Sequence, residues 1–111
     1  MKKPEPYQVF IVLLYLAISF IHLWRISEIP SGFYVDELSI GYNAALIAHT
    51  AHDEHGRILP IFLEAFGEYK NPLYVYVTSL VYKVFGVSEV GLRVPGYLFF
   101  LISLGVIYVL I

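Results

Sequence analysis

Residues 7–24, YQVFIVLLYLAISFIHLW, decide the fold, because this stretch contains no Asp, Glu, Lys or Arg and is rich in Ile, Leu and Phe. As a helix it would be about 27 Å long, close to the hydrocarbon thickness of a bilayer. Lys2 and Lys3 come before it, and Trp24 and Arg25 close it. Basic residues before a first span favour a cytoplasmic N-terminus. The stretch therefore predicts a transmembrane helix that enters the membrane from the cytoplasm.

A cleaved signal peptide is the alternative for this stretch, because a basic start followed by an apolar run is common to both. The sequence after residue 24, however, continues as RISEIP. It lacks the small-residue site at which signal peptides are cleaved. We therefore favour an uncleaved anchor.

The composition of the whole chain agrees with a membrane protein. Hydrophobic residues make up 59% of the sequence and charged residues 14%, whereas soluble domains have about 45–50% and about 25%. The mean hydropathy is +0.71, and a soluble domain of this size could not bury so much apolar surface. The net charge of −2 gives no reason to expect nucleic acid as a partner. Because the chain has no cysteine, disulfides and thiolate metal sites are excluded.

Two further apolar stretches predict two more spans, over residues 72–87 and 94–111. The first is interrupted by Lys83, whose long side chain can reach the headgroups from near the end of a span. The second is uncharged and has Pro95 in its first turn, where proline is tolerated. The predicted fold is thus an all-α membrane protein with three transmembrane helices.

The charges around these spans predict the topology. Lys83 and Arg93 flank the short turn 86–92 and favour a cytoplasmic position for it, which makes residues 25–71 one large external loop. This predicts a multi-pass protein of the cell membrane that runs in–out–in–out. Because no polar flank closes the last uncharged run, we expect the 111 residues to be part of a longer protein. The lipid bilayer and the remaining spans of that protein are then their partners.

The external loop 25–71 contains seven acidic residues and three basic ones. Apolar side chains at near-helical spacing predict a short helix over 36–51. Gly56, in the polar turn that follows, suits a left-handed backbone. Residues 60–66 predict a second short segment at the membrane surface. The loop is therefore expected to contain short juxtamembrane helices.

Asp36 and Glu37 are adjacent carboxylates shortly after the first span. At a membrane surface such a group can act as a general base on a substrate carried by a lipid. Their spacing alone favours a structural role, because acidic residues stabilise the first turn of a helix and Asp is a preferred N-cap.

Lys70, two residues after Glu68, lies where the loop returns to the membrane. A lysine at headgroup depth is well placed to bind a phosphate. An interfacial anchor, which needs no substrate, is the simpler interpretation.

Three histidines recur at intervals of three residues, at His49, His52 and His55, with Asp53 and Glu54 between the last two. Imidazoles at this spacing share a helix face and can bind zinc or a similar ion. The third histidine lies beyond the predicted end of the helix, so a metal-binding loop is a minor hypothesis.

The order of the motifs is more informative than any one of them. They are PSGFYVDE at 30–37, GYNA at 41–44, TAHDEHGRILP at 50–60, FGEYKNPLYVY at 66–76, FGVSE at 85–89 and RVP at 93–95. From residue 29 onward the chain resembles the N-terminal part of the GT-C glycosyltransferases of the protein O-mannosyltransferase and aminoarabinose transferase kind, the bacterial family-39-type membrane proteins. Two positions depart from that pattern. Ala51 replaces a frequent glycine, and Asn71 replaces the first residue of a proline pair.

The resemblance implies an enzyme that moves a sugar from a polyprenyl-phosphate donor to an acceptor on the outer face. Asp36 matches the family's proposed catalytic base, with Glu37 beside it, and Lys70 matches the residue that meets the donor phosphate. The other residues assigned to substrate binding or support are Glu68, Asp53 and Glu54. No cofactor is implied with certainty, and a divalent metal ion is an open option.

Because the family has many more spans, we expect the 111 residues alone to be inactive. The alternative hypothesis is a small non-enzymatic membrane protein or assembly partner. In that case the loop 25–71 would bind another chain instead of a sugar donor.

Overall fold

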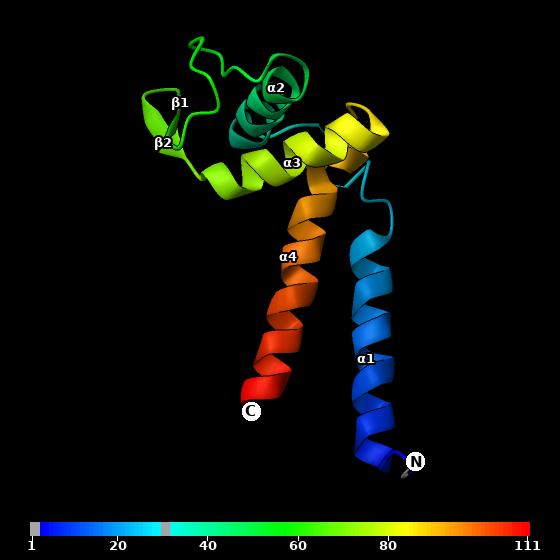
Figure 1. Cartoon of the computed structure of the whole chain (residues 1–111). Coiled ribbons are helices and arrows are strands. Elements are labelled where there is room, and N and C mark those ends of the chain that lie inside the picture. Colours follow the sequence, from blue (N-terminus) through cyan, green and yellow to red (C-terminus); the bar gives the residue numbers. More distant parts are fainter. Residues whose placement is uncertain (1–2, 30–31) are drawn as a thin grey trace.

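A computed structural model describes residues 3–29 and 32–111 and shows a mostly helical chain (Figure 1). Its helices are α1 (Pro6–Leu23), α2 (Val35–Thr50), α3 (Pro72–Phe85) and α4 (Glu89–Leu110). An antiparallel hairpin of β1 (Leu63–Ala65) and β2 (Glu68–Lys70) lies between α2 and α3. Helices α2 and α3 and the hairpin form a cap. The antiparallel helices α1 and α4 both extend from the same side of this cap, so that the two chain termini lie at the far end (Figure 1).

Two of the described helices, α1 and α4, are long and apolar enough to cross a membrane, with 18 and 22 residues. Their apolar side chains are exposed instead of being packed into a protein core, as in the case of Phe10, which is 65% exposed, and Ile21, which is 71% exposed. The accessible surface is 8137 Å², whereas a compact protein of this mass has about 6,200 Å². The predicted first span therefore agrees with α1 as a helix, within one residue at each end.

The predicted span 72–87 is different in the structure. It forms α3, whose 14 residues give a length of about 21 Å, shorter than a hydrocarbon core of about 30 Å. Figure 1 shows α3 lying across the upper end of α4 instead of alongside it. The predicted span is therefore not confirmed: α3 buries Val75 and Tyr82 in the protein and leaves other apolar side chains, such as Leu80, exposed.

One contact does not fit the predicted in–out–in–out topology. Glu37, in the loop predicted to be external, accepts a 2.7 Å hydrogen bond from Arg93, at the turn predicted to be cytoplasmic. The two segments therefore lie at the same end of α1 and α4.

Helix α4 starts earlier than predicted, because Ser88 caps it by accepting a hydrogen bond from the Gly91 amide at 2.9 Å. Pro95 thus lies inside α4 and not in its first turn.

Helix α2 agrees with the predicted helix 36–51 to within one residue, but its ends are made differently. Tyr34 is the N-cap, so Asp36 lies in the first turn and is not the cap. At the other end Ala51 adopts a left-handed backbone, with φ +60°, and its amide donates to the Ile47 carbonyl at 3.0 Å. Gly56 has the predicted positive φ, +75°, but in the loop that follows. The predicted surface segment 60–66 becomes loop and strand β1.

Replacing Ala51 with glycine is expected to raise the free energy of unfolding by about 1 kcal/mol. A left-handed backbone costs an L-residue about 1–2 kcal/mol, and glycine avoids this cost at the expense of some chain entropy. Thermal unfolding of the full chain in detergent micelles measures the change. Ala45→Gly is the matched control inside α2, and it should lower stability by about 0.5–1 kcal/mol. Equal shifts for the two variants would contradict this account.

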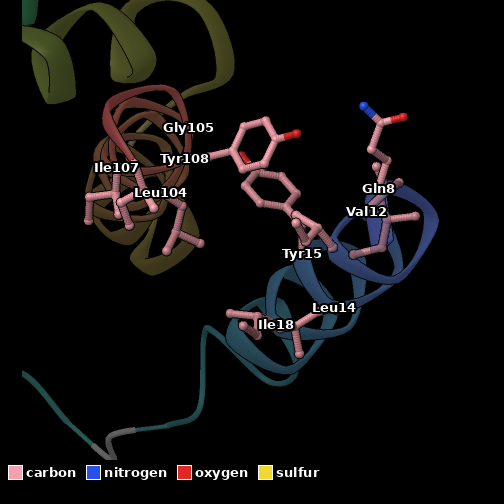
Figure 2. Close-up of a pocket in the computed structure, with 12 residues that line it drawn as sticks. Gln8, Val12, Leu14, Tyr15, Ile18, Leu104, Gly105, Ile107 and Tyr108 are labelled. Atoms are coloured by element: carbon pink, nitrogen blue, oxygen red, sulfur yellow. The ribbon is translucent and has the colours of Figure 1, made fainter. Parts of the chain in front are cut away.

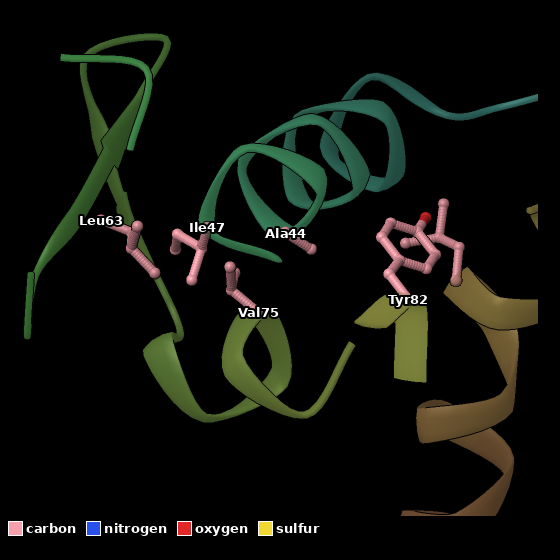
Figure 3. Close-up of a cluster of buried hydrophobic side chains, with 6 residues drawn as sticks. Ala44, Ile47, Leu63, Val75 and Tyr82 are labelled. Carbon is pink, nitrogen blue, oxygen red and sulfur yellow. The ribbon is translucent and has the colours of Figure 1, made fainter. Parts of the chain in front are cut away.

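A small core joins α2, α3, the hairpin and the start of α4 (Figure 3). Its buried members are Ala44, Ile47, Leu63, Val75, Tyr82 and Leu92. Gly41 permits the close packing, because a Cβ there would lie 3.2 Å from a Leu92 methyl carbon. This core packs α2 against α3, strand β1 and the start of α4.

Candidate active site

The first turn of α2 and the end of β2 bring two predicted site residues together. Lys70 Nζ donates to Asp36 Oδ1 at 2.5 Å, although the two residues are 34 positions apart. In the hairpin Lys70 pairs with Leu63, which is 1% exposed and belongs to the core. The strand that carries the lysine is therefore anchored. Glu68, at the other end of β2, lies with its Oε2 3.5 Å from the same ammonium group.

The three side chains of this cluster differ in exposure. The Lys70 side chain is 12% exposed, while those of Asp36 and Glu68 are 61% and 77% exposed. The lysine stem is thus covered, and its charged end meets two carboxylates that solvent can reach. The hydrogen bond to Asp36 raises the pKa of Lys70, against the opposing effect of desolvation. Lys70 therefore keeps its positive charge at neutral pH.

Glu37, the second residue of the acidic pair, has structural partners. Its Oε1 accepts from Arg93 Nε at 2.7 Å and its Oε2 accepts from the Tyr34 amide at 3.4 Å. The Arg93 side chain also donates to the carbonyls of Ile26, at 2.7 Å, and Gly32, at 3.0 Å. Only 8% of the Arg93 side chain is exposed. The two acidic residues therefore have different roles. Glu37 is held by Arg93 and the Tyr34 amide, whereas the Asp36 carboxylate is exposed to solvent.

Arg93 is a site residue that the sequence reasoning missed, since it was interpreted only as a positive-inside signal. It is the one charged residue between Glu89 and the end of the chain. An arginine that is followed by a long uncharged run is costly to bury unless it is paired. That signal could have indicated an acidic partner such as Glu37.

Asp53 and Glu54 belong to a turn that follows α2. Asp53 is 4% exposed, and its Oδ1 accepts from the amides of His55, at 3.0 Å, and Arg57, at 2.8 Å. The Glu54 amide donates at 3.1 Å to the side chain of Asn43, which is itself buried in α2. These contacts fold the turn back onto α2. They give Asp53 Oδ1 and the Glu54 amide structural partners.

The three histidines of the loop are not gathered around one point. A ring nitrogen of His52 lies 2.5 Å from the Thr50 carbonyl, and one of His55 lies 3.0 Å from the Glu64 carbonyl. Across residues 3–29 and 32–111, no group of three or more His, Cys, Asp or Glu side chains is placed to hold a metal ion. A metal ion at this loop stays a prediction without structural support.

A cavity lies away from this cluster, between the two long helices (Figure 2). It has a volume of about 570 Å³ and an apolar lining that includes Leu14, Tyr15, Leu104 and Tyr108. The Tyr15 hydroxyl donates to the Leu101 carbonyl at 3.0 Å and ties α1 to α4 beside it. An apolar chain or a further helix fits such a lining, whereas the polar chemistry is at Asp36 and Lys70.

The pair of Asp36 and Lys70 combines an accessible carboxylate with a permanent cation. A carboxylate can accept a proton from a hydroxyl group, and a fixed ammonium can neutralise a phosphate. No family model matches the chain, and neither a curated protein nor a solved structure shows significant similarity to it.

Proposed function

We propose that this chain is the N-terminal part of a membrane glycosyltransferase that uses a polyprenyl-phosphate sugar donor. In this proposal α1 crosses the membrane from the cytoplasm to the outer face, where the cap lies, and α4 crosses back toward the cytoplasm. The observation that carries the proposal is the 2.5 Å contact between Lys70 and Asp36. The sequence resemblance assigns the phosphate contact and the base to these two residues, and the fold makes them neighbours.

In the proposed reaction the acceptor hydroxyl oxygen attacks the anomeric carbon of the donor sugar. The bond from that carbon to the phosphate oxygen breaks as the new glycosidic bond forms, which inverts the configuration. Asp36 accepts the hydroxyl proton, and Lys70 neutralises the charge that the departing phosphate gains. The Asp36 side chain, 61% exposed, is open to an acceptor.

The contact between the two residues suggests an order of events. Before the donor binds, Asp36 and Lys70 neutralise one another. A donor phosphate competes with Asp36 for the ammonium group, because both are anions that accept charge-assisted hydrogen bonds. Donor binding then releases the carboxylate, which becomes free to act as a base only when a substrate is in place.

Replacing Lys70 with Met tests the donor site. Met keeps the apolar stem and removes the cation, so binding of polyprenyl phosphate to the full-length protein in lipid nanodiscs should weaken by about tenfold, the size expected for losing a charge-assisted hydrogen bond. Lys70→Arg keeps the charge and should retain most of the affinity. Lys83→Met removes an exposed lysine at the other end of α3 and serves as the control.

Unchanged binding in Lys70→Met, with wild-type binding intact, would remove Lys70 from the proposed donor site. If the wild-type full-length protein binds no polyprenyl phosphate, the transferase proposal fails. The non-enzymatic assembly partner is then the better hypothesis.

A further inference from the structure

Helix α3 has one face buried in the protein and an apolar face on the opposite side. One face is buried against the rest of the cap and contains Val75, Thr78, Ser79 and Tyr82. The other face contains Leu73, Val77, Leu80 and Val84, whose spacing of four, three and four residues places them in one stripe along the helix. Within this stripe Leu80 is 64% exposed and Val84 is 73% exposed. We name these four residues the α3 stripe.

The position of α3 relates this stripe to the two long helices. Figure 1 shows α3 lying across the upper end of α4, with α2 on one side and the long helices extending on the other. Ala44 and Ile47 of α2 belong to the core with the buried face of α3, so the stripe points away from α2. It therefore lies on the side of α3 from which α1 and α4 extend.

We infer that the α3 stripe lies in the outer boundary layer of the bilayer that α1 and α4 cross. A helix with apolar side chains on one side can rest in the plane between headgroups and acyl chains. We identify lipid as the partner of the stripe because α3 is directly connected to α4, which crosses the bilayer in the proposal. Helix α4 begins at Glu89, four residues after α3 ends at Phe85. A membrane that surrounds the upper part of α4 must then also reach α3.

Neighbouring side chains fit the same position. Lys83 is exposed beside the stripe and can extend to headgroup phosphates. The hairpin immediately before α3 exposes Phe62, Phe66 and Tyr69, and aromatic residues are enriched at the membrane interface. This inference does not depend on glycosyl transfer. If both hold, the α3 stripe fixes Lys70 at the depth of a lipid phosphate.

Single-cysteine labelling tests the inference, since the chain has no cysteine of its own. Leu80→Cys and Val84→Cys receive an environment-sensitive fluorophore in the full chain, reconstituted in vesicles of phosphatidylcholine and phosphatidylglycerol. Nitroxide lipids labelled near the headgroup probe contact with lipid, and iodide probes contact with water. Phe10→Cys on α1 is the control for lipid, and His49→Cys, exposed on α2, is the control for water.

The expected result is that the Leu80 and Val84 probes are quenched by the shallow nitroxide lipid and are several-fold less sensitive to iodide than the His49 probe. Two outcomes would overturn the inference. Iodide quenching equal to that at His49 would place the stripe in water. Protection from both quenchers at Leu80 and Val84 would show that protein covers the stripe, either a second copy or a further helix.

Discussion

Sugar transfer by the full-length protein is expected to fall by about 10²–10⁴-fold in Asp36→Asn, because this is the usual contribution of a general base. Asparagine has nearly the same shape but cannot accept the hydroxyl proton. It also removes the anion that holds Lys70 at 2.5 Å, so donor binding should be kept or slightly improved. The loss is therefore expected in kcat, measured as transfer of labelled sugar from the polyprenyl-phosphate donor.

Glu68→Gln is the matched control for Asp36→Asn. Glu68 also faces the Lys70 ammonium, at 3.5 Å, and is 77% exposed, so its replacement changes the charge of the cluster by the same amount. Transfer should fall much less than in Asp36→Asn, because Glu68 is assigned to substrate binding and not to proton transfer. Near-wild-type transfer by Asp36→Asn at normal expression would show that Asp36 is not the base. Equal losses in both variants would point to the charge of the cluster instead of to one carboxylate.

The sequence predicted those parts of the fold that depend on local pattern. The uncharged run 7–24 gave α1, and helical spacing gave α2 to within one residue. The hairpin was missed, because strands of three residues are too short to show an alternating pattern. The second predicted span, 72–87, is not confirmed, because hydropathy does not distinguish a membrane span from a helix with one face in a protein core and another exposed.

In the candidate site, too, the sequence predicted individual residues but not the contacts between them. Asp36 and Lys70 were singled out separately, but only the tertiary structure brings residues that are 34 positions apart into contact. The same structure separates the roles of Asp36 and Glu37, which adjacency in the sequence cannot do. Asp53 was predicted to contact the substrate; in the structure it is buried and its Oδ1 accepts two backbone hydrogen bonds within a turn. Long-range pairing is thus the information that the sequence pattern lacks.

Arg93→Met is expected to lower the free energy of unfolding by about 3 kcal/mol, near the lower end of the cost of breaking a buried ion pair. The lower end applies because the Glu37 side chain is 22% exposed, so water can partly solvate it once its partner is gone. The variant also leaves the carbonyls of Ile26 and Gly32 without the guanidinium that binds them. Thermal unfolding in detergent micelles measures the loss.

The effect should be localised, because Arg93 joins the start of α4 to the segment between α1 and α2. Limited proteolysis of Arg93→Met is expected to cut that segment faster. Arg25→Met is the control: its partner Glu28 is exposed, and such surface pairs contribute about 0–1 kcal/mol. Arg93→Lys should lose nearly as much as Met, since one ammonium cannot serve three acceptors in the fork geometry of a guanidinium.

A double-mutant cycle separates the ion pair from the backbone contacts of Arg93. If the pair with Glu37 carries most of the loss in stability, Glu37→Gln should lower the free energy of unfolding only slightly in the Arg93→Met background. The effects of the two substitutions will then not add. Additive effects would assign the loss to contacts of Arg93 other than the Glu37 pair, which include the Ile26 and Gly32 carbonyls. An unchanged unfolding temperature in Arg93→Met would contradict both explanations.

Arg93 is also expected to affect the reaction through the first turn of α2. Asp36 is the neighbour of Glu37 in this turn, so a loosened turn should lower kcat while donor affinity at Lys70 is kept. Arginine at position 93 would then act on the reaction only by positioning the base.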